Sequence, residues 1–226
     1  LCLMYLTGLL YNLPNVVLAA IVLVAVKGLI NIGELRHVWR VSRFEFGVSM
    51  VAFGGVLLLG ILKGVIVAVL VSMLLLIRRA AHPHVAFLGH IPGTRSYSDI
   101  ERNPDNEAVP GVLMFRVEAS LLYFNVEHVR EAVWQKVRSA AGPLSLMVCD
   151  LSTSPIVDLA GARMLAKLHE EFQAAGIRLR LVAAHAAVRD ILRAEGLEEN
   201  VGYFGRRITV ADVIDEFRGR PGNAAA

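Results

Sequence analysis

The sequence predicts a chain in two parts, an α-helical membrane segment followed by an α/β domain whose mixed β-sheet is covered by helices. The mean hydropathy of +0.55 is high for a wholly soluble protein of 226 residues. The first 80 residues contain seven Lys or Arg and two Asp or Glu, whereas the remainder contains sixteen and eighteen. The basic charge therefore belongs to the membrane flanks, which argues against a nucleic-acid-binding protein.

These differences divide the chain into four expected regions. We expect membrane helices in residues 1–80, a linker in 81–108, the α/β domain in 109–219 and a disordered tail in 220–226. The first boundary is marked where the apolar run ends at Arg78 and Arg79, since an arginine in hydrocarbon costs about 2.5–3.5 kcal/mol. Pro83 follows, and it lacks an N–H donor, so the helix should end there and continue as an extended segment.

The N-terminal part predicts one helix end and one complete apolar helix. Residues 1–13 are expected to be the end of a membrane helix, because they lack the basic start and cleavage site of a signal peptide. Pro14 suits the first turn of the next helix. Residues 16–30 are apolar except for Lys27, whose long side chain can extend toward lipid headgroups.

The segment 31–43 carries three arginines and Trp39, which is typical of an amphipathic helix at the cytoplasmic face of a membrane. Because Arg78 and Arg79 place the other end of the following run on the same side, residues 44–77 must cross an even number of times. A single helix of this length would span about 51 Å, too long for one crossing of about 30 Å. We therefore predict a helical hairpin, turning at Gly54–Gly55 or within 60–64, with the glycines of 60–64 as loop residues rather than a dimerisation motif.

After residue 108 the pattern changes to alternating strands and amphipathic helices, which predicts a sheet covered by helices. Asn125, Asp158 and Thr209 suit helix N-caps, and Gly176 and Gly196 suit helix ends. The expected strands are 112–119, 121–124, 144–151 and 178–184, and the expected helices start near 126 and 159 and cover 187–195 and 209–218.

Several runs in this order resemble one transporter family. The end of the membrane domain of SulP (SLC26-type) anion transporters resembles three runs of this sequence: LPNVVLAAIVLVAVKGLI, ELRHVWRVSRFEF and the run from Gly55 to Asp99. A STAS domain resembles residues 110–218, which contain the run VCDLSTSPIVDLAGARML. The resemblance implies the last helices of a seven-plus-seven inverted-repeat transporter, whose substrate binds between half-helices of the other half. It also implies secondary active transport of an inorganic anion. Sulfate is the expected substrate, with bicarbonate or a dicarboxylate as alternatives, and the competing function is a membrane-tethered STAS module that does not transport.

The resemblance also implies the setting and partners of the chain. We expect an integral protein of the bacterial inner (plasma) membrane, with the STAS domain in the cytoplasm. Its partners would be the transported anion, the lipid bilayer, a cytoplasmic protein or nucleotide at the STAS domain, and a second copy in a homodimer. Nucleic acid is not an expected partner.

Catalytic, cofactor and metal sites are not expected. The runs 16–30 and 48–77 contain no Asp, Glu or Arg, and Lys63 suits an interfacial anchor, so no substrate site is expected in this part of the membrane domain. His82 and His84 flank a proline and are expected to be exposed linker residues rather than metal ligands. Cys149 lies in an apolar strand, where a thiol is inert.

The loop before the Asp158 helix contains the candidate regulatory or partner-binding residues: Asp158, Ala160, Gly161, Ser152 and Ser154. A helix N-terminus presents free N–H groups that suit a phosphate, a nucleotide or a carboxylate of a partner. In the anti-sigma-factor antagonists that share the STAS domain, the corresponding motif is Asp-Ser-Ser/Thr-Gly and its second hydroxyl residue is phosphorylated. Ala160 stands at that position here. Capping by Asp158 and turn formation by the two serines remain the structural alternatives.

Overall fold

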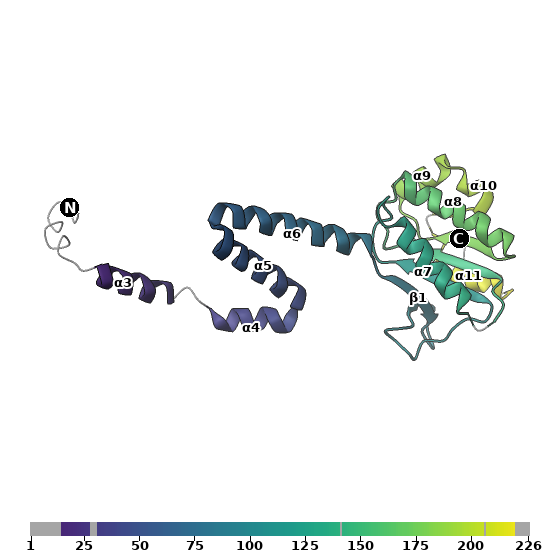
Figure 1. The fold of residues 1–226 in the computed structure, drawn as a ribbon. Helices are drawn as coiled ribbons and strands as arrows, with labels where there is room; N and C mark the ends of the chain where they lie inside the picture. Colours follow the sequence, from purple (N-terminus) through teal and green to yellow (C-terminus); the bar gives the residue numbers. More distant parts are fainter. Residues whose placement is uncertain (1–14, 28–30, 141, 206, 220–226) are drawn as a thin grey trace. The chain divides into compact units, whose positions relative to one another are not determined.

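The computed structural model describes residues 15–27, 31–140, 142–205 and 207–219, which fall into two compact units, 1–74 and 75–226. The expected helix end in 1–13, the break at Pro14 and the tail 220–226 lie outside the described residues. Each unit is described by itself (Figure 1).

The first unit consists of helices α3 (Asn15–Lys27), α4 (Ile32–Val41), α5 (Arg43–Leu59) and the start of α6 (Ile61–Ala81). Asn31 caps α4 by accepting a hydrogen bond from the N–H of Glu34 at 3.1 Å. Ser42 ends α4 and caps α5, since its hydroxyl accepts from the N–H of Glu45 at 3.2 Å. These caps explain how two helices of different polarity follow each other directly.

The predicted hairpin in residues 44–77 is confirmed as a pair of helices, α5 and α6, which meet at Gly60 with φ of 81°. Gly64 is not a loop residue, because it lies within α6 and is buried. A Cβ atom at Gly64 would overlap the backbone of Val56. The second glycine therefore permits close approach of the two helices.

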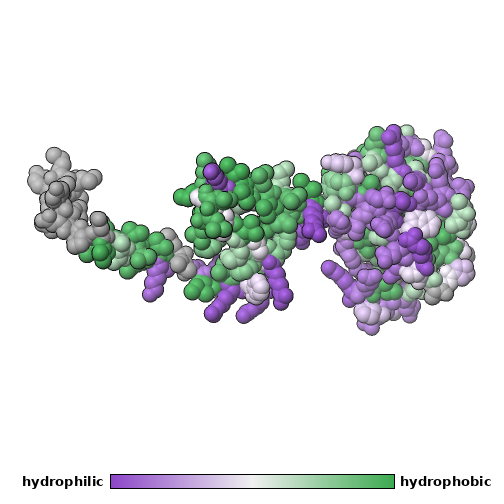
Figure 2. All heavy atoms as spheres, in the orientation of Figure 1, coloured by the Kyte–Doolittle hydropathy of each residue, from purple (hydrophilic) through white to green (hydrophobic). Residues whose placement is uncertain are grey.

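The surfaces of these helices are apolar. Leu58 is 86% exposed and Ile61 is 78% exposed, and no residue of α5 is buried. By length and composition, the stretches Val16–Val41 and Ile61–Ala81 can each cross a membrane. Figure 2 shows apolar surface over α3, α5 and α6 and a mixed surface over the second unit.

The second unit contains a five-stranded mixed sheet in the order β2-β1-β3-β4-β5. Its strands β3 (Val112–Val117), β4 (Leu146–Asp150) and β5 (Arg178–Val182) are parallel. In contrast, β1 (Val85–His90) runs antiparallel to both β3 and β2 (Tyr97–Asp99). The predicted mixed α/β fold is thus confirmed.

Helices cover both faces of this sheet, as expected from the alternation of side chains along a strand. The helices are α7 (Val126–Arg138), α8 (Leu159–Ala174), α9 (Ala186–Ala194), α10 (Leu197–Val201) and α11 (Val210–Phe217). Phe115 and Met147 pack with Leu165 and Phe172 in one core, whereas the neighbouring strand residues Met114 and Val148 pack with Val213 and Ile214 in the other.

Three local expectations differ from the structure. The range 81–108, expected to be a linker, contains β1 and β2, so it forms part of the sheet. The run 121–124 is not a strand beyond a single bridge of Leu121, because the side chain of Asn125 accepts the N–H of Leu122 at 3.0 Å and closes a turn. The short helix α10 was not expected from the sequence.

His82 and His84 are exposed, as expected, but both make contacts within the folded second unit. His84 Nε2 lies 2.9 Å from Asp99 Oδ2, which joins the start of β1 to the end of β2. The ring of His82 packs edge-on against that of His128, at 4.9 Å between centroids, and His128 Nε2 lies 3.2 Å from the carbonyl oxygen of Pro83. Both residues are therefore part of the folded second unit.

Candidate functional site

The candidate loop follows β4 and leads into α8, at the carboxyl end of the parallel strands. This end of a parallel sheet is where ligands bind in many α/β proteins. Asp158 is the N-cap of α8, because its Oδ1 accepts from the N–H of Gly161 at 2.8 Å. Its Oδ2 accepts from the N–H of Tyr123, also at 2.8 Å. The carboxylate thus caps the helix and fixes the neighbouring loop after β3.

The backbone of the two loops is paired as well. The N–H of Leu121 donates to the carbonyl of Ile156 at 3.0 Å, and the N–H of Asp158 donates to the carbonyl of Leu121 at 3.0 Å. A Cβ atom at Gly161 would lie 2.8 Å from that same Leu121 oxygen and 2.9 Å from Val157. Gly161 therefore serves close packing of α8 against the loop and is not exposed to a ligand.

Asp158 and Ala160 line a surface hollow of about 530 Å³, which we call the α7–α8 hollow. Ala160 is half-buried and has no hydroxyl that could be phosphorylated. The remaining lining residues come from the loop before α7 and from α7 and α8: Tyr123, Val126, Glu127, Arg130, Leu159, Arg163, Met164 and Lys167.

Around this hollow lie apolar side chains that the sequence analysis did not single out. Tyr123 is 73% exposed, Ile156 is 58% exposed and Leu159 is 49% exposed. Each of these residues stands beside turn or cap residues in the sequence. An apolar residue next to such a turn is the sequence signal that could have predicted an exposed contact surface here. Scattered exposed apolar residues are common on proteins, but Tyr123 and Ile156 lie in two loops that pair with each other, and Leu159 is the first residue of α8.

Three cations, Arg130, Arg163 and Lys167, and two carboxylates, Glu127 and Asp158, line the hollow. Arg130 donates to Glu127 at 2.9 Å and to Glu171 at 3.0 Å, which fixes its guanidinium between α7 and α8. The hydrogen bond from Arg130 lowers the pKa of Glu127 and the same bond raises the pKa of Arg130, so both remain charged near neutral pH. Arg163 and Lys167 add two further cations along α8.

Ser154 and Ser152 do not join this hollow. Ser154 is fully buried, and its hydroxyl donates to the carbonyl of Ala119 at 2.9 Å, so it has the structural turn-forming role. Ser152 is exposed and lines a different hollow of about 560 Å³, beside Asp150 and Thr209. The five candidate residues therefore divide between a helix cap, a buried turn and a second surface region.

Within the part of the chain that the structure describes, no group of three His, Cys, Asp or Glu side chains is placed to hold a metal ion. Cys149 is fully buried in β4, and burial raises the pKa of its thiol well above the usual value, with Asp150 adding to the effect. A thiol in this environment stays protonated and unreactive.

Known proteins match both parts of the chain. Residues 1–52 match the Sulfate permease family, and residues 103–215 match the STAS domain. The chain is similar to "Low affinity sulfate transporter 3" of Stylosanthes hamata, with 33% identity over 95% of this chain and 35% of that protein. A probable sulfate transporter of Mycobacterium tuberculosis is 32% identical over 95% of this chain and 38% of its own length.

A solved structure shows the same fold. The murine Solute Carrier 26 family member A9 anion transporter, in its inward-facing state, superposes with a TM-score of 0.64 and 26% identity, covering 73% of this chain and 27% of that one. The chain thus spans about a third of the length of the curated relatives it matches.

Proposed function

The chain belongs to the sulfate permease (SulP) family and combines membrane helices with a STAS domain, and from this premise we propose that it is the C-terminal portion of a secondary active anion transporter. Sulfate is the proposed substrate, because the similar plant and mycobacterial proteins carry that name. The supporting observation is the order of parts: exposed apolar helices end at Arg78 and Arg79, and the STAS fold follows directly.

The described membrane helices have a supporting role in this proposal. Residues 48–77 contain no Asp, Glu or Arg, and Lys63 is their one charged residue. Anion sites in transporters use positively charged groups or half-helix ends near the bilayer midplane. We therefore place the substrate site in parts of the transporter other than this stretch.

Transport is tested by uptake of radiolabelled sulfate in a bacterial strain that lacks its own sulfate importers and carries the complete gene. We expect uptake that saturates with sulfate and that excess unlabelled sulfate suppresses. Competition by bicarbonate or succinate in place of sulfate would identify one of those anions as the substrate. Absence of uptake of all three, at confirmed expression in the membrane, would favour the tethered module without transport.

For the STAS domain, we propose that the α7–α8 hollow binds a cytoplasmic protein that regulates transport. The apolar side chains of Tyr123 and Leu159, next to the cations Arg130, Arg163 and Lys167, suit a partner segment with apolar and acidic residues. Because Ala160 has no hydroxyl, regulation at this position would not use phosphorylation.

This role is tested with two substitutions at Asp158 and one at Ala160. Asp158→Asn keeps a good N-cap and removes the charge, whereas Asp158→Arg removes both. We expect Asp158→Arg and Ala160→Asp to change the maximal uptake rate without changing the apparent affinity for sulfate, and Asp158→Asn to have the smaller effect. Wild-type uptake by all three variants at equal surface expression would leave the loop with a structural role alone.

We further propose that the loop 31–43 and the STAS domain lie in the cytoplasm of a bacterial cell, the membrane being the inner one. Arginine placement supports this orientation. In a background without Cys2, single cysteines at Ser42 and Ser139 should not react with a membrane-impermeant thiol reagent on intact cells, but should react after permeabilisation. A cysteine at Lys63 is the matched control and should react from outside. External labelling at Ser42 or Ser139 would contradict the orientation.

A further inference from the structure

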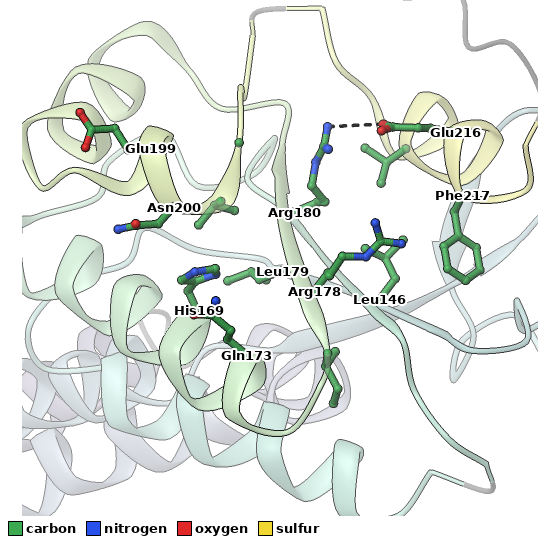
Figure 3. Close-up of a pocket in the computed structure, with 14 residues that line it drawn as sticks. Leu146, His169, Gln173, Arg178, Leu179, Arg180, Glu199, Asn200, Glu216 and Phe217 are labelled. Carbon is green, nitrogen blue, oxygen red and sulfur yellow. Dashed lines mark ion pairs between the residues drawn. The ribbon is translucent and has the colours of Figure 1, made fainter.

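Another cavity of the STAS domain, of about 500 Å³, lies at the edge strand β5 between α8, α10 and α11 (Figure 3). It is separate from the α7–α8 hollow and from the hollow beside Ser152, since it shares no lining residue with either. Its volume is in the range of about 300–1,000 Å³ that is usual for small-molecule sites.

Positively charged side chains come from β5. Arg178 is exposed, and the structure assigns it no ion pair among the described residues. Arg180 Nη2 lies 3.5 Å from Glu216 Oε2, but the Glu216 side chain is 65% exposed. An exposed pair at this distance is weak, of about 0–1 kcal/mol, so Arg180 can exchange this partner for a ligand.

The opposite wall supplies neutral polar groups. Figure 3 shows His169 and Gln173 on α8, with Asn200 above them on α10. The His169 Nδ1 atom is buried and has no hydrogen-bond partner. A buried polar atom without a partner costs about 1–3 kcal/mol, which a ligand oxygen or a water molecule would relieve.

Apolar residues complete the lining. Between the polar groups the wall is formed by Leu146, Ile177, Leu179, Val201, Val213 and Phe217. All of these side chains are buried except that of Phe217, which is partly exposed, so Phe217 offers an apolar surface that a ligand body can cover and a simple inorganic ion cannot. Glu199 also lines the cavity, but its carboxylate points away from the two arginines in Figure 3.

We propose that this cavity binds a small organic anion, with a phosphate or carboxylate group held by Arg178 and Arg180 and an aromatic or apolar body against Phe217. His169 and Gln173 donate or accept hydrogen bonds to the polar substituents of the ligand. This site goes beyond the proposed transport function and does not depend on it.

The test uses phenyl phosphate, which combines a phosphate with an aromatic ring, and inorganic phosphate as the comparison. Each is titrated by calorimetry into the chain in lipid nanodiscs, with empty nanodiscs as the blank. We expect phenyl phosphate to bind at least about tenfold more tightly than inorganic phosphate. Arg178→Gln should weaken phenyl phosphate binding about tenfold, as expected for loss of a charge-assisted hydrogen bond of about 1.5 kcal/mol.

Two variants separate the site from general charge effects. Arg102→Gln removes another exposed arginine, which does not line the cavity, and should leave binding unchanged. Gln173→Glu adds a negative charge to the exposed α8 wall and should weaken binding without unfolding the domain. Equal binding of both phosphates, equal effects of Arg178→Gln and Arg102→Gln, or no binding at millimolar phenyl phosphate would overturn the proposal.

Discussion

The two units treat apolar side chains in opposite ways. In α5 and α6, Leu58, Ile61 and Leu74 are between 66% and 86% exposed, whereas in the STAS domain Phe115 and Phe172 are completely buried. A leucine in either unit has the same cost of contact with water, about 25 cal/mol per Å². The difference shows that the first unit is adapted to a different solvent, the hydrocarbon of a bilayer, while the second makes its own interior.

The largest expected effect comes from shortening one leucine in each unit. Leu165→Ala leaves a cavity in the STAS core, where Leu165 is fully buried, and should lower the free energy of unfolding by about 2–5 kcal/mol. Leu70→Ala, at a side chain that is 60% exposed, should leave the unfolding of the domain unchanged. Urea unfolding in nanodiscs, followed by Trp134 fluorescence in a Trp39→Phe background, measures both. Similar losses for both variants would contradict the distinction between the units.

Introducing a charged side chain into each unit also tests whether the two units are surrounded by different solvents. Leu70→Arg should reduce membrane insertion, because an arginine near the middle of a membrane helix costs about 2.5–3.5 kcal/mol. Tyr123→Arg, at an exposed position of the STAS domain, should change stability by less than about 0.5 kcal/mol. Resistance to alkaline extraction from membranes measures insertion. If Leu70→Arg is retained as well as the wild type, α6 does not meet hydrocarbon at that position.

The smallest expected effect concerns a buried carboxylate in the domain. Burial raises the pKa of Asp99. Hydrogen bonds from His84 and from the N–H of Glu101 lower this pKa by a larger amount, so the net shift is downward. A lowered folded-state pKa stabilises the fold above the ordinary aspartate pKa, and this contribution is lost as pH falls through the folded value. Asp99→Asn should thus cost about 1 kcal/mol at pH 7.

The pH dependence is the decisive part of this prediction. The urea midpoints of wild type and Asp99→Asn should converge as the pH falls below about 4, the ordinary range of an aspartate. Glu45→Gln, at an exposed residue of α5, is the control and should leave the unfolding of the domain unchanged at every pH. A constant difference between wild type and Asp99→Asn across this range would show that the carboxylate charge has no role.

Much of the fold follows from local patterns, and the errors arise where distant contacts decide. The hairpin of α5 and α6 and the cap at Asp158 were predictable, because hydropathy and capping act within a few residues. The strand at Val85–His90 was not, since its short apolar run is stabilised by pairing with β2 and β3. At 121–124 the apolar run favours a strand, but hydrogen bonds of Asn125 hold a turn.

The candidate site was predictable only in part for the same reason. From the sequence it was possible to predict that Asp158 caps a helix and that Ala160 lacks a hydroxyl for phosphorylation. Ser152 and Ser154 are two residues apart, yet one is exposed and the other fully buried. That separation depends on the carbonyls of Val117 and Ala119, which lie more than thirty residues away in sequence. The exposed position of Tyr123 likewise depends on the pairing of two loops.

The short connection between α6 and β1 has a consequence for any regulator of this protein. Only His82, Pro83 and His84 separate the two elements, and three residues extend by at most about 11 Å. A connection of this length keeps the first strand of the STAS domain within about 11 Å of the end of α6. If the STAS domain binds a regulator, as proposed above, this short connection holds the regulator beside the transporter, where its effective concentration reaches about the millimolar range. At such an effective concentration, even a regulator with weak affinity for the transporter would occupy the transporter while it is bound to the STAS domain of the same molecule.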